Sequence, residues 1–363
     1  MASRSDAPII SVRDVRRVFR STKKGEGIKG ALNLLIKPEY QEHEALKGVS
    51  FEIEAGSFNG LIGANGAGKT TLLKILSGLI PPSSGEARVL GFDPFKRSLD
   101  FRHSISLVMG QKAQLWWDLP AVDAFDLLRA IYEIPEAKYK ERLHTLTELL
   151  DVNRHLNTQI RRLSLGERMK MELIGALLHW PRVIFLDEPT IGLDVLAAHK
   201  LREFLRVFNA KERATIILTS HNMDDIERLC SRVLILRSGE MIYDGRPDGL
   251  VRKGEQRLRV RLMERPSLDQ LSAETTIPRA QIAFAQLEDS GGDAASHGEE
   301  SQPVVFSIHQ EQIVHVLQSL MKKHTIVDMG IEEQSLEAVI QRLYEEDRAA
   351  RPTSSSAVQG TLS

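Results

Sequence analysis

The chain has 363 residues, with 48 Lys and Arg against 49 Asp and Glu, and its net charge of −1 excludes the strong basic field typical of nucleic-acid-binding proteins. Its single cysteine, Cys230, excludes an intramolecular disulfide framework and is expected to be a small buried residue in a reducing compartment. No stretch reaches the ~18 consecutive apolar residues that span a bilayer, and the N-terminus lacks the apolar core of a signal peptide. We therefore expect a cytoplasmic chain that is soluble on its own.

Residues 1–250 alternate short β-branched runs with helical stretches, which predicts an α/β domain. Two antiparallel strands are expected in "IISVRDVRRVF" and "ALKGVSFEIEAG", separated by an insertion at 22–44 that could form a short amphipathic helix. The apolar runs "VIFLD" and "TIILTS" are typical of parallel strands covered on both faces. Residues from about 112 to 165 interrupt the alternation with "AFDLLRAIYEI" and "YKERLHTLTELLDV", whose apolar spacing predicts a helical subdomain.

The composition changes after residue 250. "QRLRVRLME" and "PVVFSIH" are predicted strands, and "QEQIVHVLQSLMKK" and "SLEAVIQRLYEE" are predicted amphipathic helices. They flank a polar run at 288–302, which we interpret as a loop. Residues 251–346 are therefore predicted to form a small appended α+β domain, and residues 347–363 a disordered tail.

A glycine-rich loop follows a short apolar strand in "LIGANGAGKTTLLKILSGL". Its glycines let backbone N–H groups converge on phosphates at the positive end of the following helix. In this pattern a lysine reaches the β- and γ-phosphates, and the next hydroxyl holds Mg²⁺. The residues predicted to bind the nucleotide here are Gly63, Asn65, Gly66, Gly68, Lys69, Thr70 and Thr71.

A second constraint comes from "RVIFLDEPTIGLD". Its buried strand delivers Asp187 to the strand end, where it can hold Mg²⁺ through water, and Glu188 follows on the opposite side as a candidate general base. The strand "TIILTS" then leads to His221, which we expect at the same edge of the sheet, facing the γ-phosphate. Without the loop, this pair of acids would be interpreted as solvated strand-end residues. Beside the loop, it indicates hydrolysis of a nucleotide phosphate.

The segment "RRLSLGERMKMELIGALLHWP" places Ser164 and Gly166 at the start of a helix, where a hydroxyl, amides and a helix dipole are offered to an anion. Together with the loop and "FLDEPTIGLD", it resembles the nucleotide-binding subunits of ATP-binding-cassette (ABC) transporters over residues 8–250. The resemblance implies a P-loop NTPase cassette, in which a RecA-like parallel-sheet core carries an antiparallel β subdomain and a helical subdomain. It also implies ATP and Mg²⁺ as ligands.

Several site residues follow from the resemblance. Gln111 in "LVMGQKAQLWWDLP" matches the glutamine that contacts Mg²⁺ and water. Ser164 and Gly166 match the signature motif, which grips the γ-phosphate held by the opposite subunit, and Asp194 matches the dimer-interface loop. The resemblance assigns the metal to Thr70, Gln111 and Asp187, and the catalytic roles to Glu188, His221 and Gln111.

The chain departs from the family pattern at two positions. Leu165 and Glu167 replace the first glycine and the glutamine of the commonest signature sequence, which bears on how the dimer closes. For the aromatic residue that stacks on adenine, Phe19 fits best by position, and Tyr40 is the alternative.

"GQKAQLWWDLPAVDAFDLLRAIYEI" and "SHNMDDIERLC" resemble a bacterial subgroup of export-type ATPases with separate membrane subunits of about six helices. Trp116 and Trp117 are expected either in the core or in a groove that faces the membrane subunit. The resemblance implies a dimer of two cassettes, and both half-sites here look competent, which permits a homodimer and leaves a non-identical partner open. It also implies a peripheral position on the cytoplasmic face of the membrane and no nucleic-acid partner.

Three alternatives are weighed against the exporter subunit. A sugar-type importer ATPase would normally have a signature region rich in glutamine and arginine, unlike "LSLGERMKMEL". A translation-factor ATPase normally carries two cassettes, whereas one phosphate loop occurs here. A DNA-repair cassette needs a long coiled coil or zinc-binding cysteines, which one cysteine cannot supply.

Overall fold

The computed structural model describes residues 7–22, 40–110, 113–250, 255–284 and 302–333, together with 336, 339 and 340. The chain divides between Pro247 and Asp248 into two compact units, and each unit is described separately below. Within the described residues, no helix has both the length and the apolar character required to cross a membrane.

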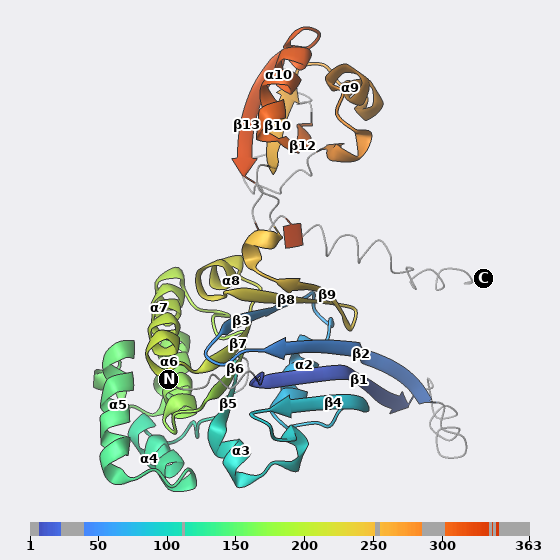
Figure 1. The fold of residues 1–363 in the computed structure, drawn as a ribbon. Coiled ribbons are helices and arrows are strands. Elements are labelled where there is room, and N and C mark those ends of the chain that lie inside the picture. The colour runs from blue at the N-terminus through green and yellow to red at the C-terminus, as the bar shows by residue number, and fades with distance from the viewer. Residues whose placement is uncertain are drawn as a thin grey trace, which may run out of the picture. The chain divides into compact units, whose positions relative to one another are not determined.

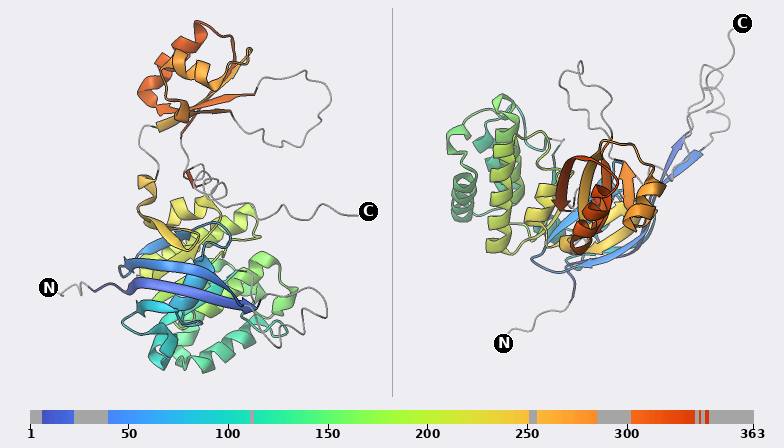
Figure 2. Two further views of the ribbon diagram at one scale, coloured as in Figure 1. Left: turned by 90° about the vertical axis from the view of Figure 1, so that its right-hand side faces the viewer. Right: turned by 90° about the horizontal axis from the view of Figure 1, so that it is seen from above.

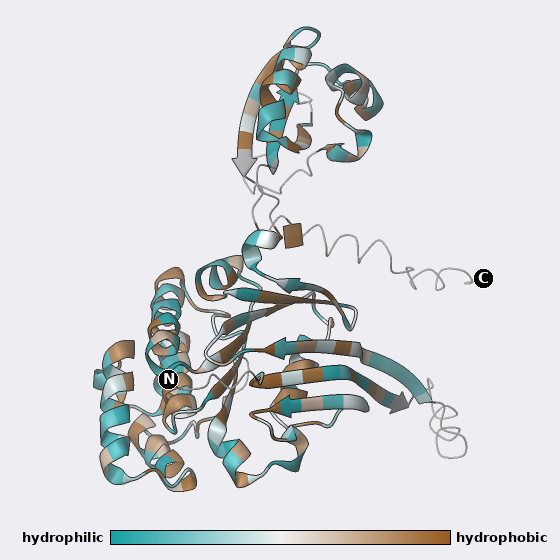
Figure 3. Cartoon of the chain, in the orientation of Figure 1, coloured by the Kyte–Doolittle hydropathy of each residue, from teal (hydrophilic) through white to brown (hydrophobic). Residues whose placement is uncertain are grey.

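The first unit is built on a six-stranded sheet with the order β5-β6-β7-β3-β8-β9 (Figure 1). Its first five strands are parallel and β9 is antiparallel to β8. The strands are β3 Phe58–Ile62, β5 Ile105–Met109, β6 Val183–Asp187, β7 Thr215–Thr219, β8 Arg232–Arg237 and β9 Glu240–Gly245. The central strands β3 and β7 are buried along their whole length, as expected for parallel strands covered on both faces (Figure 3).

A second, antiparallel sheet has the order β2-β1-β4. Its strands are β1 Ile10–Thr22, β2 Tyr40–Ile53 and β4 Ser84–Val89. Strand β2 begins at Tyr40, so the last residues of the predicted insertion belong to a strand; the remainder, 23–39, lies outside the described residues. One core joins this sheet to the parallel sheet through α2: Val12 and Phe51 share a buried cluster with Leu72 and Phe185.

The helices of the first unit are α2 Lys69–Leu76, α3 Leu99–Ser104, α4 Ala121–Ile131, α5 Glu136–Leu150, α6 Leu165–Leu177, α7 Val195–Glu212 and α8 Met223–Leu229. Helices α4 and α5 lie on the opposite side of the parallel sheet from β1 and β2 (Figures 1 and 2). They occupy the segment that the sequence predicts as a helical subdomain. Helix α6 begins at Leu165, earlier than the Met169 start that its apolar pattern indicates, because Ser164 caps it.

The second unit contains β10 Glu255–Leu262, α9 Leu268–Thr275, β11 Ile282–Phe284, β12 Val304–His309, α10 Ile313–Met321 and β13 Ile326–Glu333. The four strands form an antiparallel sheet with the order β11-β12-β10-β13, the arrangement of a ferredoxin-like split βαβ fold. Its own apolar core includes Leu258, Phe306 and Val316. The sequence prediction missed α9, β11 and β13, and most of "SLEAVIQRLYEE" lies outside the described residues.

Candidate nucleotide-binding and hydrolysis site

The glycine-rich loop joins β3 to α2, and its lysine already holds the loop in shape. Lys69 Nζ donates to the carbonyl oxygens of Gly63, at 2.5 Å, and Ala64, at 3.3 Å. Burial lowers the pKa of Lys69, although the nearby Glu188 and Asp187 carboxylates oppose that shift. The ammonium group is therefore placed inside the loop, where phosphate oxygens can replace or join the two carbonyls.

Two glycines of the loop have left-handed backbone conformations for different reasons. Gly68 has φ 107°, and a Cβ there would lie 2.6 Å from the carbonyl oxygen of Ala45, so only glycine fits. Gly66 has φ 84° and is exposed; a Cβ on it would meet no atom within 4 Å, and Asn65 beside it is also exposed. The loop is consequently packed at Gly68 and open to a ligand at Gly66.

The acidic part of the site lies at the carboxyl end of the parallel strands, where Met109, Asp187 and Thr219 are aligned in register. Thr70 Oγ1 donates to Asp187 Oδ2 at 3.0 Å, and Thr219 Oγ1 donates to Asp187 Oδ1 at 2.7 Å. The hydroxyl of Thr70 and the carboxylate of Asp187 are hard oxygen donors within hydrogen-bonding distance. They fit Mg²⁺, which takes one or two protein oxygens and completes its shell with phosphates and water.

Glu188 follows directly and has a left-handed backbone with φ 54°, which turns the chain out of β6. Its N–H donates to Thr219, to Oγ1 at 3.0 Å and to the carbonyl oxygen at 3.1 Å. Its Oε1 lies 3.0 Å from His221 Nε2, and the side chains of Glu188 and His221 are 20% and 42% exposed. The pair is thus in contact and reachable by water, as the general-base prediction requires.

A buried ionic cluster that the sequence prediction did not identify supports the loops around these residues. Asp225 is fully buried and its carboxylate accepts from Thr190 and Ser220, both at 2.6 Å. Arg202 Nη1 donates to the same carboxylate at 2.8 Å. Asp225 therefore ties the loop after β6 to the loop that carries His221. In the sequence, the only indication of this cluster was the pair of adjacent aspartates in "SHNMDDIERLC".

Ser164 and Gly166 form a second cluster with Asp194. Ser164 caps α6 through a capping box with Glu167, and Asp194 caps α7 by accepting from the N–H of Ala197 at 2.8 Å. A Cβ on Gly166 would lie 3.5 Å from that of Ala197, so the two helix starts pack against each other. Among the described residues, no hydrogen bond joins Ser164, Gly166 or Asp194 to Thr70 or Asp187.

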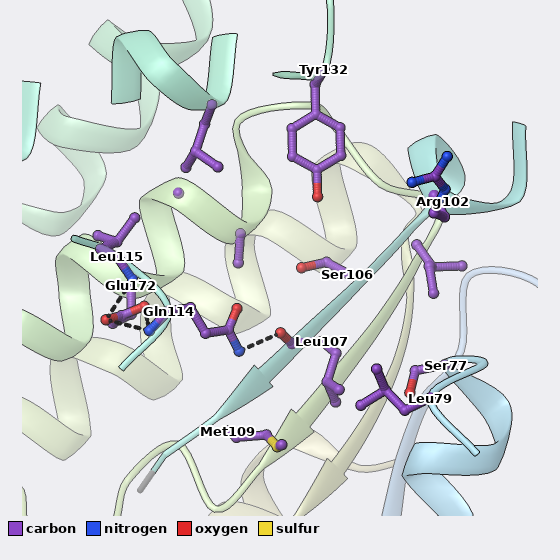
Figure 4. Close-up of a pocket in the computed structure, with 14 residues that line it drawn as sticks. Ser77, Leu79, Arg102, Ser106, Leu107, Met109, Gln114, Leu115, Tyr132 and Glu172 are labelled. Atoms are coloured by element: carbon purple, nitrogen blue, oxygen red, sulfur yellow. Dashed lines mark hydrogen bonds between the residues drawn. The ribbon is translucent and has the colours of Figure 1, made fainter. Parts of the chain in front are cut away.

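A cavity of about 420 Å³ separates the parallel-sheet region from the helical segment (Figure 4). Residues from β5, α3 and the segment after α2 line one side, and Tyr132 and Glu172 belong to the other. The buried Glu172 carboxylate accepts from the backbone N–H of Gln114, at 3.1 Å, and Leu115, at 3.3 Å. It therefore anchors the segment that follows Gln111, a residue that lies outside the described ones.

The aromatic candidates all have substantial exposure. Trp116 and Trp117 are 44% and 46% exposed, which excludes the alternative that they are core residues. Arg168 stacks over the ring of Trp117 at 4.6 Å. Phe19 lies in β1 with the Arg17 guanidinium 4.7 Å from its ring, and Tyr40 begins β2. The predicted buried position of Cys230 is confirmed.

Comparison with known proteins agrees with this arrangement. The ABC transporter family model matches residues 46–191. The ABC transporter ATP-binding protein NatA of Bacillus subtilis is 33% identical over 207 residues, which cover 57% of this chain and 84% of that protein. The Nod factor export ATP-binding protein I of Ralstonia nicotianae is 29% identical over 291 residues, covering 80% and 88% of the two chains. The methionine import ATP-binding protein MetN 2 of Enterococcus faecalis is 27% identical over 282 residues, covering 75% and 80%.

A solved structure described as the ATP-binding subunit of an ABC transporter superposes with a TM-score of 0.55 at 27% identity and covers 67% of this chain and 91% of its own. The fold class predicted from the sequence is thereby confirmed. The phosphate loop, the strand-end acids and these relatives lead to one conclusion: the chain belongs to the ABC transporter family and is an ATP-binding subunit that hydrolyses ATP.

Proposed function

We propose that this chain is the ATPase subunit of an ABC exporter, which dimerises around two ATP·Mg²⁺ and drives a separate membrane permease. Glu188 carries the chemical step as general base, with His221 orienting its carboxylate and the attacking water. Lys69 and the loop amides hold the phosphates. Thr70 and Asp187 hold Mg²⁺, which neutralises developing charge on the phosphates when bound. Phe19 is the proposed adenine-stacking residue.

The observation that supports a dimer is an apolar surface around Ser164, Gly166 and Asp194. Val195 is 85% exposed, Leu196 65% and Leu165 45%, and all three adjoin Asp194 or Ser164. Apolar side chains gathered beside anion-binding helix starts suit a surface that closes over a partner's nucleotide. Ser164 and Gly166 would then meet the γ-phosphate held by the other subunit. A homodimer is the simplest assembly, because this chain carries both half-sites.

The proposed contact with the permease, at the cytoplasmic face of the membrane, is a groove lined by Trp117, Arg168 and Ile191. Two half-exposed tryptophans adjoin the segment that Glu172 anchors, and tryptophan is enriched at the centres of protein interfaces. Movement of α6 on dimer closure would reach this groove directly through Glu172. Gln111 is assigned to the same route and to Mg²⁺ by its place in the sequence.

Export is favoured by the resemblance of residues 110–134 to export-type ATPases and by the relative named for Nod factor export. Import is the second candidate, because a relative named for methionine import matches over a similar length. The two directions need the same ATPase chemistry, so the decision depends on the permease.

Affinity purification of the tagged chain from detergent-solubilised cells, followed by mass spectrometry, tests this proposal. We expect one stoichiometric membrane protein with about six spanning helices. Inside-out vesicles containing that permease should then accumulate solutes from a cell extract when ATP is added. Loss of preloaded solutes instead would indicate import, and recovery with ribosomes or DNA without a membrane protein would refute the transporter.

A further inference from the structure

The carboxylate of Glu167 lies at the helix start that is proposed to receive the partner's γ-phosphate. Its Oε2 accepts from the backbone N–H of Ser164 at 3.0 Å and from Ser164 Oγ at 2.9 Å. The N–H of Glu167 donates back to Ser164 Oγ at 3.3 Å. Glu167 therefore fixes the rotamer of Ser164 and accepts its hydroxyl proton, which must turn away from Glu167 before it can be donated to a phosphate.

This arrangement places a negative charge where another negative charge must enter. The hydrogen bonds from Ser164 lower the pKa of Glu167, so the carboxylate is ionised at neutral pH. Its other oxygen, Oε1, lies 2.9 Å from His155 Nε2, and the side chains of Glu167 and His155 are 29% and 22% exposed. A protonated His155 would cancel the charge of Glu167, and a neutral His155 would leave it.

The contacts of His155 make this choice specific. Arg154 Nε lies 2.9 Å from the same His155 nitrogen. A nitrogen that donates to Glu167 cannot also accept from Arg154. Protonation puts a hydrogen on both ring nitrogens, so a protonated His155 keeps the contact with Glu167 and loses the one with Arg154. The other charged groups around this site are Asp151, Lys170 and Lys200, and none of these side-chain types ordinarily titrates near neutral pH.

We propose that Glu167 and His155 are positioning residues of the trans γ-phosphate site: Glu167 orients Ser164, and protonated His155 offsets the charge that Glu167 brings. This inference rests on the proposed function, in which Ser164 meets the partner's nucleotide. The proposal predicts that ATP-driven dimerisation is stronger at lower pH. A neutral His155 leaves the Glu167 carboxylate facing the partner's γ-phosphate with no positive charge to offset it as the dimer closes.

The test uses the full chain carrying Glu188→Gln, so that ATP is bound without turnover. Analytical ultracentrifugation in the presence of Mg²⁺ measures the ATP concentration at which half of the protein is dimeric. The measurement is repeated at several pH values between about pH 6 and about pH 8. We expect this concentration to rise about fivefold over that range in the parent. At every pH, the His155→Gln variant should require the higher ATP concentration that the parent requires at the alkaline end of the range. The Glu167→Gln variant should require, at every pH, the lower ATP concentration that the parent requires at the acidic end.

His144→Gln is the matched control, because this histidine is exposed on α5, and it should keep the parental pH profile. His221 and the γ-phosphate are present in every variant, so only differences from the parent are compared, and urea unfolding checks that each variant is folded. A dimer whose pH profile is unchanged by His155→Gln or Glu167→Gln would overturn this inference alone. Absence of any ATP-dependent dimer in the parent would overturn the proposed dimer and this inference together.

Discussion

At the scale of single residues, one hydroxyl orients both strand-end acids. Thr219 Oγ1 donates to the carboxylate of Asp187 and accepts from the backbone N–H of Glu188, so it holds one carboxylate directly and fixes the backbone that carries the other. The hydrogen bonds that the N–H of Glu188 donates to Thr219 stabilise the left-handed backbone conformation of Glu188. Asp187 is thereby directed to Thr70, and Glu188 to His221.

Replacing Glu188 by Gln should lower kcat by at least about 10²–10⁴-fold, because an amide cannot accept a proton from water. ATP binding should survive, since Lys69 and the loop are untouched. The measurement is phosphate release at saturating ATP, with Glu203→Gln as the control, because Glu203 is exposed on α7 and pairs with Arg206. Turnover within a few-fold of the unaltered chain would contradict the assignment of Glu188 as general base.

At the scale of elements, the site depends on two loops that follow neighbouring parallel strands. The loop after β6 and the loop after β7 are joined beneath the site by Asp225, which bonds Thr190 and Ser220. Arg202 from α7 supplies the balancing charge from within the fold. The position of His221 is therefore set by a buried ionic cluster and does not depend on its own exposed contacts.

Asp225→Ala should destabilise the first unit by about 3–5 kcal/mol, because it leaves the buried Arg202 without a counter-charge. Asp224→Ala is the matched control at the adjacent position; Asp224 is half exposed and should cost less than about 1 kcal/mol. Urea unfolding of both variants measures the difference. Equal costs would show that the cluster does not support the loops.

The strand-end site was predictable because it depends on order along the chain. A strand that ends in Asp187, a loop ending in Lys69 and a strand leading to His221 must meet at one edge of a parallel sheet. The supporting contacts were not predictable in this way. Glu172 bonds backbone groups more than fifty residues earlier, and only the three-dimensional packing of α6 brings them together.

Two of the three elements missed in the second unit, β11 and α9, are short. Strand β11 has three residues, too few for an apolar alternation to be recognised, and the eight residues of α9 include polar and β-branched ones. The apolar pattern of α6 begins only at Met169, and its start is fixed by the Ser164 cap, which the sequence also places at a helix start.

At the scale of the whole molecule, each of the two units has, among its described residues, a hydrophobic cluster of its own. The first joins both sheets of the cassette through α2, and the second fills the ferredoxin-like unit. Only the first unit contains the predicted ATP site residues. Ligand binding should therefore stabilise one core and leave the other unchanged.

Calorimetry of the intact chain should resolve two unfolding transitions. A non-hydrolysable ATP analogue with Mg²⁺, at about 100 times its Kd, should stabilise the cassette by about 2.7 kcal/mol and raise its Tm by several degrees. The second transition should not move. One merged transition, or an equal shift of both, would mean that the two cores unfold as a single unit.

The pairing of the first and last strands of the second unit bears on how this unit could evolve. Strands β10 and β13 are adjacent and antiparallel, and Gln256 pairs with Glu333. The chain at the start of β10 and the chain at the end of β13 therefore lie side by side at one end of the sheet, about 5 Å apart. A gene can gain, exchange or lose such a stretch while the residues on either side keep their spacing. Natural selection can thus alter the appendage independently of the ATPase sequence that precedes it.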